Sequence, residues 1–226
     1  MHKLILFFFF VTALSALKAQ EFNYKKDFDR ILEQTKNSSN ELYHKNLMKK
    51  YQDNSPELSD YEMLALLIHF TSDPHYKPYE ILSQEENIKS IIEQKEYQKA
   101  IKLCDSLLDH HPFNQAILFE MALINFELER FEKSENYRIK FNRIMDAMAY
   151  SGSGNSTESA IFSLGTRDSH FYIANRLSYT IEKVGAGQDD SGNMVDIIET
   201  FEKGKGTRLL HFQIQHAVNR LLESTE

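Results

Sequence analysis

Histidines invite the first question about chemistry, because neutral imidazoles bind transition metals and also act as general acids and bases. The closest groupings in sequence are Asp109-His110-His111, Asp73-x-His75 and His211 with His216. Adjacent helix residues point about 100° apart, so the pair at 110 and 111 rarely shares one metal ion. No His-Glu-x-x-His motif, which would place two ligands on one helix face, occurs. The spacing therefore predicts no metal site and no cofactor.

The sequence also contains no motif for nucleophilic or acid–base catalysis. The sequence has no Gly-x-Ser-x-Gly nucleophile elbow, and its single cysteine, Cys104, falls on an apolar helical stripe where a thiol is inert. The paired carboxylates Glu85-Glu86 and Asp189-Asp190 lack the apolar neighbours that raise a carboxyl pKa, so we interpret them as solvated. The glycine- and serine-rich stretch 150–158 lacks the Gly-Lys-Ser/Thr ending of a P-loop and is interpreted as a turn or linker. We predict that the protein is not an enzyme.

A metal-dependent or hydrolytic enzyme is the alternative, because folding can bring distant histidines and carboxylates together. Convergence of three or more of five histidines in one pocket would favour this alternative. The five are His44, His69, His75, His170 and His211.

The N-terminus predicts export. A short basic start, Met1 to Lys3, precedes an apolar run from Leu4 to Ala16, and thirteen residues are too few for a membrane-spanning helix of about 20. The run is typical of a secretory signal peptide, here residues 1–19 with cleavage after Ala19, and predicts a periplasmic or extracellular protein. No later apolar stretch is long enough to span a bilayer, so no stable membrane insertion is expected after cleavage.

Composition limits the partners. The 226-residue chain has a formal net charge of −7, and loss of Lys3 and Lys18 with the signal leaves 24 basic and 33 acidic residues, or −9. An acidic surface repels polyanions, so nucleic acid is not an expected partner. A lone cysteine forms no internal disulfide, so burial of a hydrophobic core must stabilise the fold.

A helical repeat occupies residues 81–149. Two turn aromatics, Tyr97 and Phe131, lie 34 residues apart, and the small residues Ala100 and Ser134 keep this offset. A period of 34 residues is typical of tetratricopeptide repeats, in which the aromatic packs between helices and the small residue permits close crossing. We predict two such units, with Ser83-x-x-Glu86 as the capping box that opens the first. An ordinary helical bundle with accidental spacing is the alternative.

Two units cannot bury their own end faces, so capping elements are expected. Residues 20–80 supply apolar helical faces, and Ser59-x-x-Glu62 predicts a capping box at the start of a hydrophobic helix. These N-terminal helices should cover the first repeat.

The helical period stops after Tyr150, and residues 150–226 predict a small β-containing region. Strand-like stretches at 160–164, 179–184, 194–201 and 208–214 surround a short helix capped by Asp168, and the last two read as an antiparallel hairpin. A final helix should turn Val218, Leu221 and Leu222 inward. The fold class is therefore α+β and mainly α: helical hairpins, N-terminal capping helices and a small C-terminal antiparallel sheet.

The order of short motifs resembles a known exported family of Bacteroidetes, domain of unknown function 4919. The resemblance rests on Leu47-x-x-x-Tyr51, Leu58-Ser59-x-x-Glu62, Tyr76-x-Pro78-Tyr79, Gly152-x-Gly154-x-Ser156-x-Glu158-x-Ala160, Val195-Asp196-Ile197-Ile198 and Leu210-His211-Phe212-Gln213-Ile214. The chain departs from the family pattern at Leu67-Ile68-His69, where a more aromatic, glycine-containing stretch is usual. The resemblance implies export and this architecture, and it implies no activity.

The expected function is that of a protein-interaction module of the cell envelope. In proteins that this repeat resembles, partners lie along the first helix of each unit. The matching positions here form a candidate partner groove of Lys89, Glu93, Phe119, Leu123 and Phe126. The three apolar members, Phe119, Leu123 and Phe126, either bind a protein or peptide or are covered by the C-terminal sheet. We favour covering by the sheet.

Overall fold

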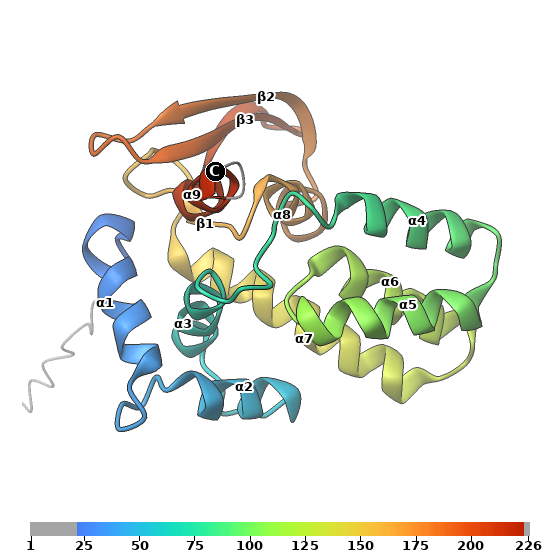
Figure 1. Ribbon diagram of the computed structural model, residues 1–226. Coiled ribbons are helices and arrows are strands. Elements are labelled where there is room, and N and C mark those ends of the chain that lie inside the picture. Colours follow the sequence, from blue (N-terminus) through green and yellow to red (C-terminus); the bar gives the residue numbers. More distant parts are fainter. Residues whose placement is uncertain (1–21, 224–226) are drawn as a thin grey trace, which may run out of the picture.

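The computed structural model describes residues 22–223, so the predicted signal peptide lies outside the described residues. Within that part, nine α-helices and a small four-stranded sheet confirm the expected mainly α class (Figure 1). None of the helices in residues 22–223 is both long enough and apolar enough to cross a membrane.

Three N-terminal helices form the lower left of Figure 1, and the third lies at the centre of the core. They are α1 (Tyr24–Lys36), α2 (His44–Gln52) and α3 (Asp60–Phe70). Every residue of α3 from Met63 to Ile68 is at most 1% exposed. A helix that is apolar on all sides must be enclosed, and α3 packs against α1, α2 and the long helix 131–151 that ends the array.

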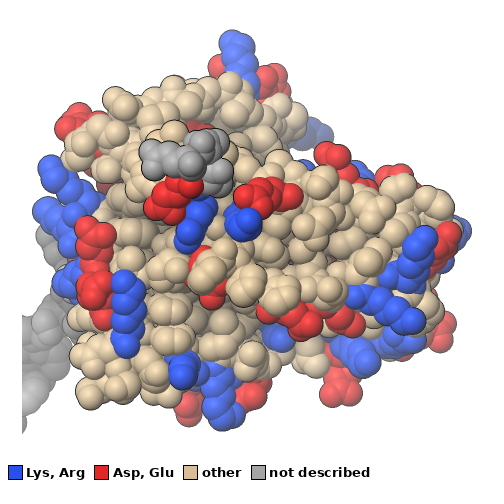
Figure 2. All heavy atoms as spheres, viewed as in Figure 1, with Lys and Arg blue, Asp and Glu red and all other residues tan. Residues whose placement is uncertain are grey.

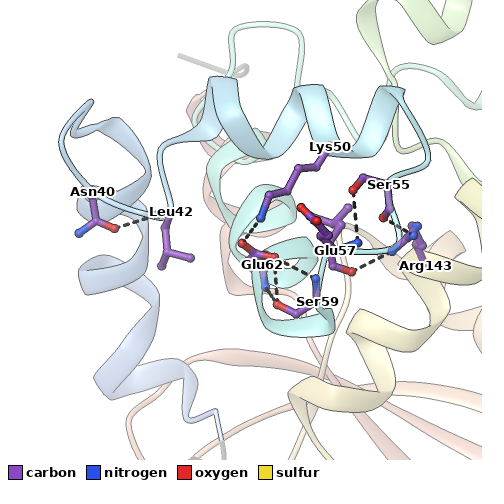
Figure 3. Close-up of polar contacts among 9 residues, drawn as sticks. Asn40, Leu42, Lys50, Ser55, Glu57, Ser59, Glu62 and Arg143 are labelled. Carbon is purple, nitrogen blue, oxygen red and sulfur yellow. Dashed lines mark hydrogen bonds and ion pairs between the residues drawn. The ribbon is translucent and has the colours of Figure 1, made fainter.

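The start of α3 is fixed by the predicted capping box (Figure 3). The Ser59 hydroxyl accepts a hydrogen bond from the Glu62 backbone N–H, and the Glu62 carboxylate accepts one from the Ser59 backbone N–H. Lys50 of α2 donates to Glu62 at 2.6 Å, so the cap also joins α2 to α3. Arg143, in the long helix 131–151, donates hydrogen bonds to the carbonyl oxygens of Ser55 and Leu58. These bonds link that helix to the α2–α3 turn.

Four helices form the array at the right of Figure 1, at the positions that the 34-residue period predicts. They are α4 (Leu82–Glu93), α5 (Tyr97–His110), α6 (Gln115–Glu127) and α7 (Phe131–Ser151). Two details of the prediction are wrong. Helix α4 begins before Ser83, which therefore lies inside the first turn and is not an N-cap. Phe131 is 59% exposed rather than packed between helices.

The sheet packs above the end of α7 and has the strand order β1-β4-β3-β2. Its strands are β1 (Ile161–Phe162), β2 (Thr180–Gln188), β3 (Met194–Glu202) and β4 (Gly206–Gln213). The predicted antiparallel hairpin is β3–β4, with Ile198 opposite Leu210, and β2 pairs with β3 in the same sense. Strand β1 joins β4 in parallel, so the sheet is mixed. Strand β2 also continues through residues 185–188, beyond the end of the strand expected at 179–184.

Short helices connect and close the sheet: α8 (Thr166–Phe171), the π-helical turn η1 (Tyr172–Leu177) and α9 (Gln215–Glu223). The N-cap of α8 is Gly165, so the expectation that Asp168 caps it is wrong. In α9, Val218 packs on the core, whereas Leu221 and Leu222 are 42% and 60% exposed and do not face inward as predicted.

Candidate functional site

The candidate partner groove is partly closed by the C-terminal region. Phe119 is half-buried, with its ring 5.6 Å from Phe141 and 6.4 Å from Phe171 at the end of α8. We expected the C-terminal sheet to cover this groove, but Phe171, which contacts Phe119, belongs to α8, a helix that precedes β2. Phe119 is therefore a packing residue of the junction between the array and the C-terminal region.

The other four groove residues stay exposed on α4 and α6. Lys89 and Glu93 are exposed on α4, and both act on the carboxylate of Glu120, a half-buried residue on α6. Burial raises the pKa of Glu120, Lys89 opposes this shift and Glu93 adds to it. On the same helix Leu123 and Phe126 are 46% and 58% exposed.

An aromatic patch forms where α6 turns into α7, and we define it as Leu123, Phe126 and Phe131. The rings of Phe126 and Phe131 meet edge to face with centroids 5.7 Å apart. In the preceding unit the equivalent aromatic, Tyr97, is half-buried against a cluster that includes Ile124 of α6. Phe131 is exposed because α7 leads into the core and no further helical pair follows it.

The rest of that α7 face is polar, which marks the end of the array. At the 34-residue offset, Ile101 and Cys104 of α5 correspond to Glu135 and Arg138 of α7. These two form an exposed ion pair at 2.6 Å. An ion pair costs little free energy when it remains in contact with water. Exposure of the apolar aromatic patch to water is unfavourable.

A second feature is an open groove between α2, α3 and the α5–α6 turn, which we call the histidine groove. Its volume is about 490 Å³, and His44, His69, His75 and His110 line it together with Asp73 and Asp109. Three of the five histidines whose convergence would favour an enzyme therefore line one groove. The other two lie elsewhere: His170 is on α8, and His211 on β4 contacts the Gly154 carbonyl.

The groove histidines do not converge on one point. They stack as two face-to-face pairs, His44 with His69 and His75 with His110. Two parallel rings direct their in-plane lone pairs side by side rather than at a shared ion. Among residues 22–223, no group of three or more His, Cys, Asp or Glu side chains has the geometry to hold a metal.

A third feature, the carboxylate pocket, is a small cavity of about 40 Å³ at the junction of α4, α6 and α8. Glu85 is 5% exposed, and its carboxylate accepts a hydrogen bond from the Asn114 side-chain amide at 2.6 Å. The side-chain oxygen of Asn114 in turn caps α6 by accepting a hydrogen bond from the Ile117 backbone N–H. Arg167 Nε lies 2.6 Å from the second Glu85 oxygen, although its N–H is not directed at that oxygen.

Burial gives this pocket two unusual acids. Desolvation raises the pKa of Asp168 to about 8, with the Glu85 charge adding to the shift and Arg167 opposing it. Desolvation also raises the pKa of Glu85, against the lowering effects of Asn114 and Arg167. A carboxyl group that keeps its proton near neutral pH can donate a hydrogen bond or a proton.

No local pattern in the sequence indicates this pocket. Sequence spacing predicts a solvated Glu85 and a capping Asp168, and it indicates no role for their neighbours Asn114 and Arg167. These positions are far apart in the chain, and only the packing of α8 on the array brings them together. Cys104 agrees with its sequence interpretation, since it is fully buried and burial raises its thiol pKa to about 12.

The comparisons identify a family and no function. The family model described as domain of unknown function (DUF4919) matches residues 29–222. The chain belongs to this family. No curated protein and no solved structure matches it. The DUF4919 match spans all three features described above, so none of them lies in an accessory segment.

Proposed function

We propose that this DUF4919 chain is an exported, non-enzymatic interaction module that binds a protein or peptide through the aromatic patch. The observation that carries this proposal is the exposure of three large apolar side chains, Leu123, Phe126 and Phe131, at one turn. Contiguous exposed apolar groups are costly in water and are characteristic of interaction sites.

The helical array supports the same proposal. The 34-residue correspondence between α4–α5 and α6–α7 resembles that of tetratricopeptide repeats, in which partners lie along the first helix of each unit. Leu123 and Phe126 lie on such a first helix. Lys89 and Glu93 on α4 provide charges of both signs near Glu120 of α6, which would orient a partner rather than attract one strongly.

Export to the periplasm or the outside of the cell is part of the proposal and rests on residues 1–19 of the sequence. Figure 2 shows basic and acidic side chains interspersed over the visible face, without an extended basic area. This distribution favours a protein partner over nucleic acid.

The test is affinity capture of the tagged protein from its own cell envelope, repeated with Phe126→Glu and Leu123→Glu. Each substitution places a charge in the aromatic patch without touching the core. Matched controls are Leu209→Glu and Val184→Glu, because these apolar residues are each 51% exposed on the sheet. Loss of a captured protein with the patch variants alone supports the proposal. Equal capture by all four variants excludes the patch. Phe119→Glu is not useful, since Phe119 packs against Phe141 and Phe171.

A second candidate is a metal-dependent or hydrolytic enzyme, and the observation that favours it is the shared groove of His44, His69 and His75. The rings would have to leave their stacked arrangement to bind one ion. Calorimetric titration with Zn²⁺, followed by assays of ester and peptide hydrolysis, tests this candidate. Tight binding that is lost in His44→Ala and His75→Ala supports it, whereas absence of binding and of turnover removes it.

A further inference from the structure

The histidine groove is bordered by two stacked imidazole pairs that join different elements. His44 and His69 have ring centroids 3.9 Å apart and planes 8° apart, and they join the start of α2 to the last turn of α3. His75 and His110 are 4.5 Å and 20° apart, and they join the loop after α3 to the end of α5. Such close parallel stacking requires that at least one ring of each pair is neutral.

Hydrogen bonds fix the tautomers of the first pair. The Thr35 carbonyl can only accept, so His44 Nδ1–H donates to it at 3.0 Å. The Thr35 hydroxyl already donates to the Leu32 carbonyl, so His69 Nδ1–H donates to the Thr35 hydroxyl oxygen at 2.9 Å. Each ring therefore carries its proton on Nδ1 and leaves Nε2 as the site for a second proton.

The second pair follows the same rule at a more exposed position. The Asp73 carboxylate accepts from His75 Nδ1–H at 2.9 Å, which again leaves Nε2 unprotonated in the neutral ring. For His44, His69 and His75 alike, Nε2 has no hydrogen-bond partner among residues 22–223. Three imidazoles of one groove are thus held as neutral bases that can each take up a proton from solvent.

We infer that the histidine groove is a pH-sensitive clamp: protonation of both rings of a stacked pair separates α2 from α3 and widens the groove in acid. One proton per pair is compatible with stacking, because an imidazolium ring can face a neutral aromatic ring. A second proton places two like charges about 4 Å apart, and the stack then becomes repulsive.

The surrounding charges set the direction and the range of this response. Lys36 of α1 opposes protonation of His69, whereas Asp73 after α3 favours it. Lys45 and Lys49 of α2 also line the groove. Burial, followed by the neighbouring His44, lowers the pKa of His69 from 6.5 to about 4.

At the other pair, the neighbouring charged groups are Asp73 and Asp109, which line the groove, and Lys77 in the loop after α3. Burial lowers the pKa of His111, and the nearby rings of His110 and His75 add to this shift.

Helix α2 is the element that should move. Its N-cap position, Tyr43, makes no side-chain capping bond within the described chain, so the His44 stack and the Thr35 contact hold this end in place. A cation at a helix N-terminus also opposes the helix dipole. Protonation of His44 would thus weaken the end of α2 that the stack secures.

Hydrogen exchange of the α2 amides, measured at about pH 7 and about pH 4.5 and corrected for intrinsic rates, tests the clamp. We expect protection of α2 to fall about tenfold in acid, relative to the amides of α6. His69→Phe keeps an aromatic stack that carries at most the single charge of His44, so its α2 protection should fall less in acid than that of the wild type. His69→Gln is a second neutral variant in case phenylalanine disturbs the packing, and His170→Gln is the control outside the groove.

NMR titration of the histidine ring protons in the wild-type protein provides an independent measurement. A clamp requires coupled titration, so His44→Gln should raise the midpoint of His69 by about one pH unit. The inference is overturned by a His69 midpoint that ignores His44→Gln, or by α2 protection that falls equally in wild type and His69→Phe.

Discussion

Glu85 and Arg167 connect the first helix of the array to the C-terminal region through an ion pair of 2.6 Å at the carboxylate pocket. The Glu85 side chain is 4% exposed, whereas that of Arg167 is 39% exposed. The pair thus has one buried and one partly solvated member, and the buried member depends on its partners for compensation. Asn114 supplies the only hydrogen bond to this carboxylate within the described residues, because the Arg167 N–H is not directed at it.

Loss of Arg167 should therefore destabilise the protein by leaving the Glu85 charge uncompensated. We expect Arg167→Met to lower the free energy of unfolding by about 1–3 kcal/mol, less than for a fully buried pair because Arg167 is partly solvated. The double variant Glu85→Gln/Arg167→Met should return to within about 1 kcal/mol of wild type, since no buried charge is left. Urea denaturation of the three variants measures this coupling. Additive losses in the double variant would contradict it.

Asp168 should make stability fall as the pH rises. Its pKa is raised from 3.8 to about 8, so between these values the native state holds a proton that the unfolded state has released. Stability then decreases with pH over this window by up to about 1.4 kcal/mol per pH unit. Asp168→Asn removes the titrating group and should be more stable than wild type at about pH 8, with a flatter pH profile. Thermal unfolding across this range measures the effect, and parallel profiles for the two proteins would refute it.

The carboxylate pocket shows why sequence alone identifies sites of this kind poorly. Glu85 was assigned to a solvated surface because its neighbours in sequence are polar, yet α8 covers it with residues from much later in the chain. Asp168 fitted a local capping pattern, but the helix began earlier, at Gly165. A raised carboxyl pKa depends on what packs over the group, and local spacing does not report that.

Histidine 216 should make the protein sensitive to acid. Its ring is 5% exposed, stacks on Phe162 with centroids 4.5 Å apart, and donates through Nε2 to the Ser163 carbonyl. Burial lowers its pKa from 6.5 to about 4, so between these values only the unfolded state binds the proton. Stability is complete above about pH 6.5 and falls by about 3 kcal/mol as the pH drops to about 4.

His216→Phe keeps the stacking but has no titrating group. The variant loses the Ser163 hydrogen bond, at a cost of about 1 kcal/mol at neutral pH, and should lose less stability than wild type on acidification. His211→Gln is the matched control, because His211 also hydrogen-bonds to a backbone carbonyl but is only half-buried and lies outside the histidine groove. Thermal midpoints between about pH 7 and about pH 4 check this, and an unchanged acid slope in His216→Phe would refute it.

The fold itself was more predictable than its sites, because its strongest signals are local. The 34-residue period located α4 to α7, and the Ser59–Glu62 spacing located the start of α3. Exposure was less predictable. The 34-residue period predicts that Phe131 packs between helices, but its side chain is exposed because the array ends at α7. Where the array ends depends on the whole chain and is not visible in the local sequence.

Arg143 should stabilise the α2–α3 turn more than its partly exposed position suggests. It reaches from α7 to the carbonyl oxygens of Ser55 and Leu58 at 2.5 and 2.8 Å, and hydrogen bonds from a charged donor are the stronger kind (Figure 3). Arg143→Met should keep the aliphatic packing, leave both carbonyls without this donor and lower the free energy of unfolding by about 2 kcal/mol. Arg138→Met on the same helix is the matched control, because its ion pair with Glu135 is exposed and should contribute less than about 1 kcal/mol. Equal losses in the two variants would show that the turn does not depend on Arg143.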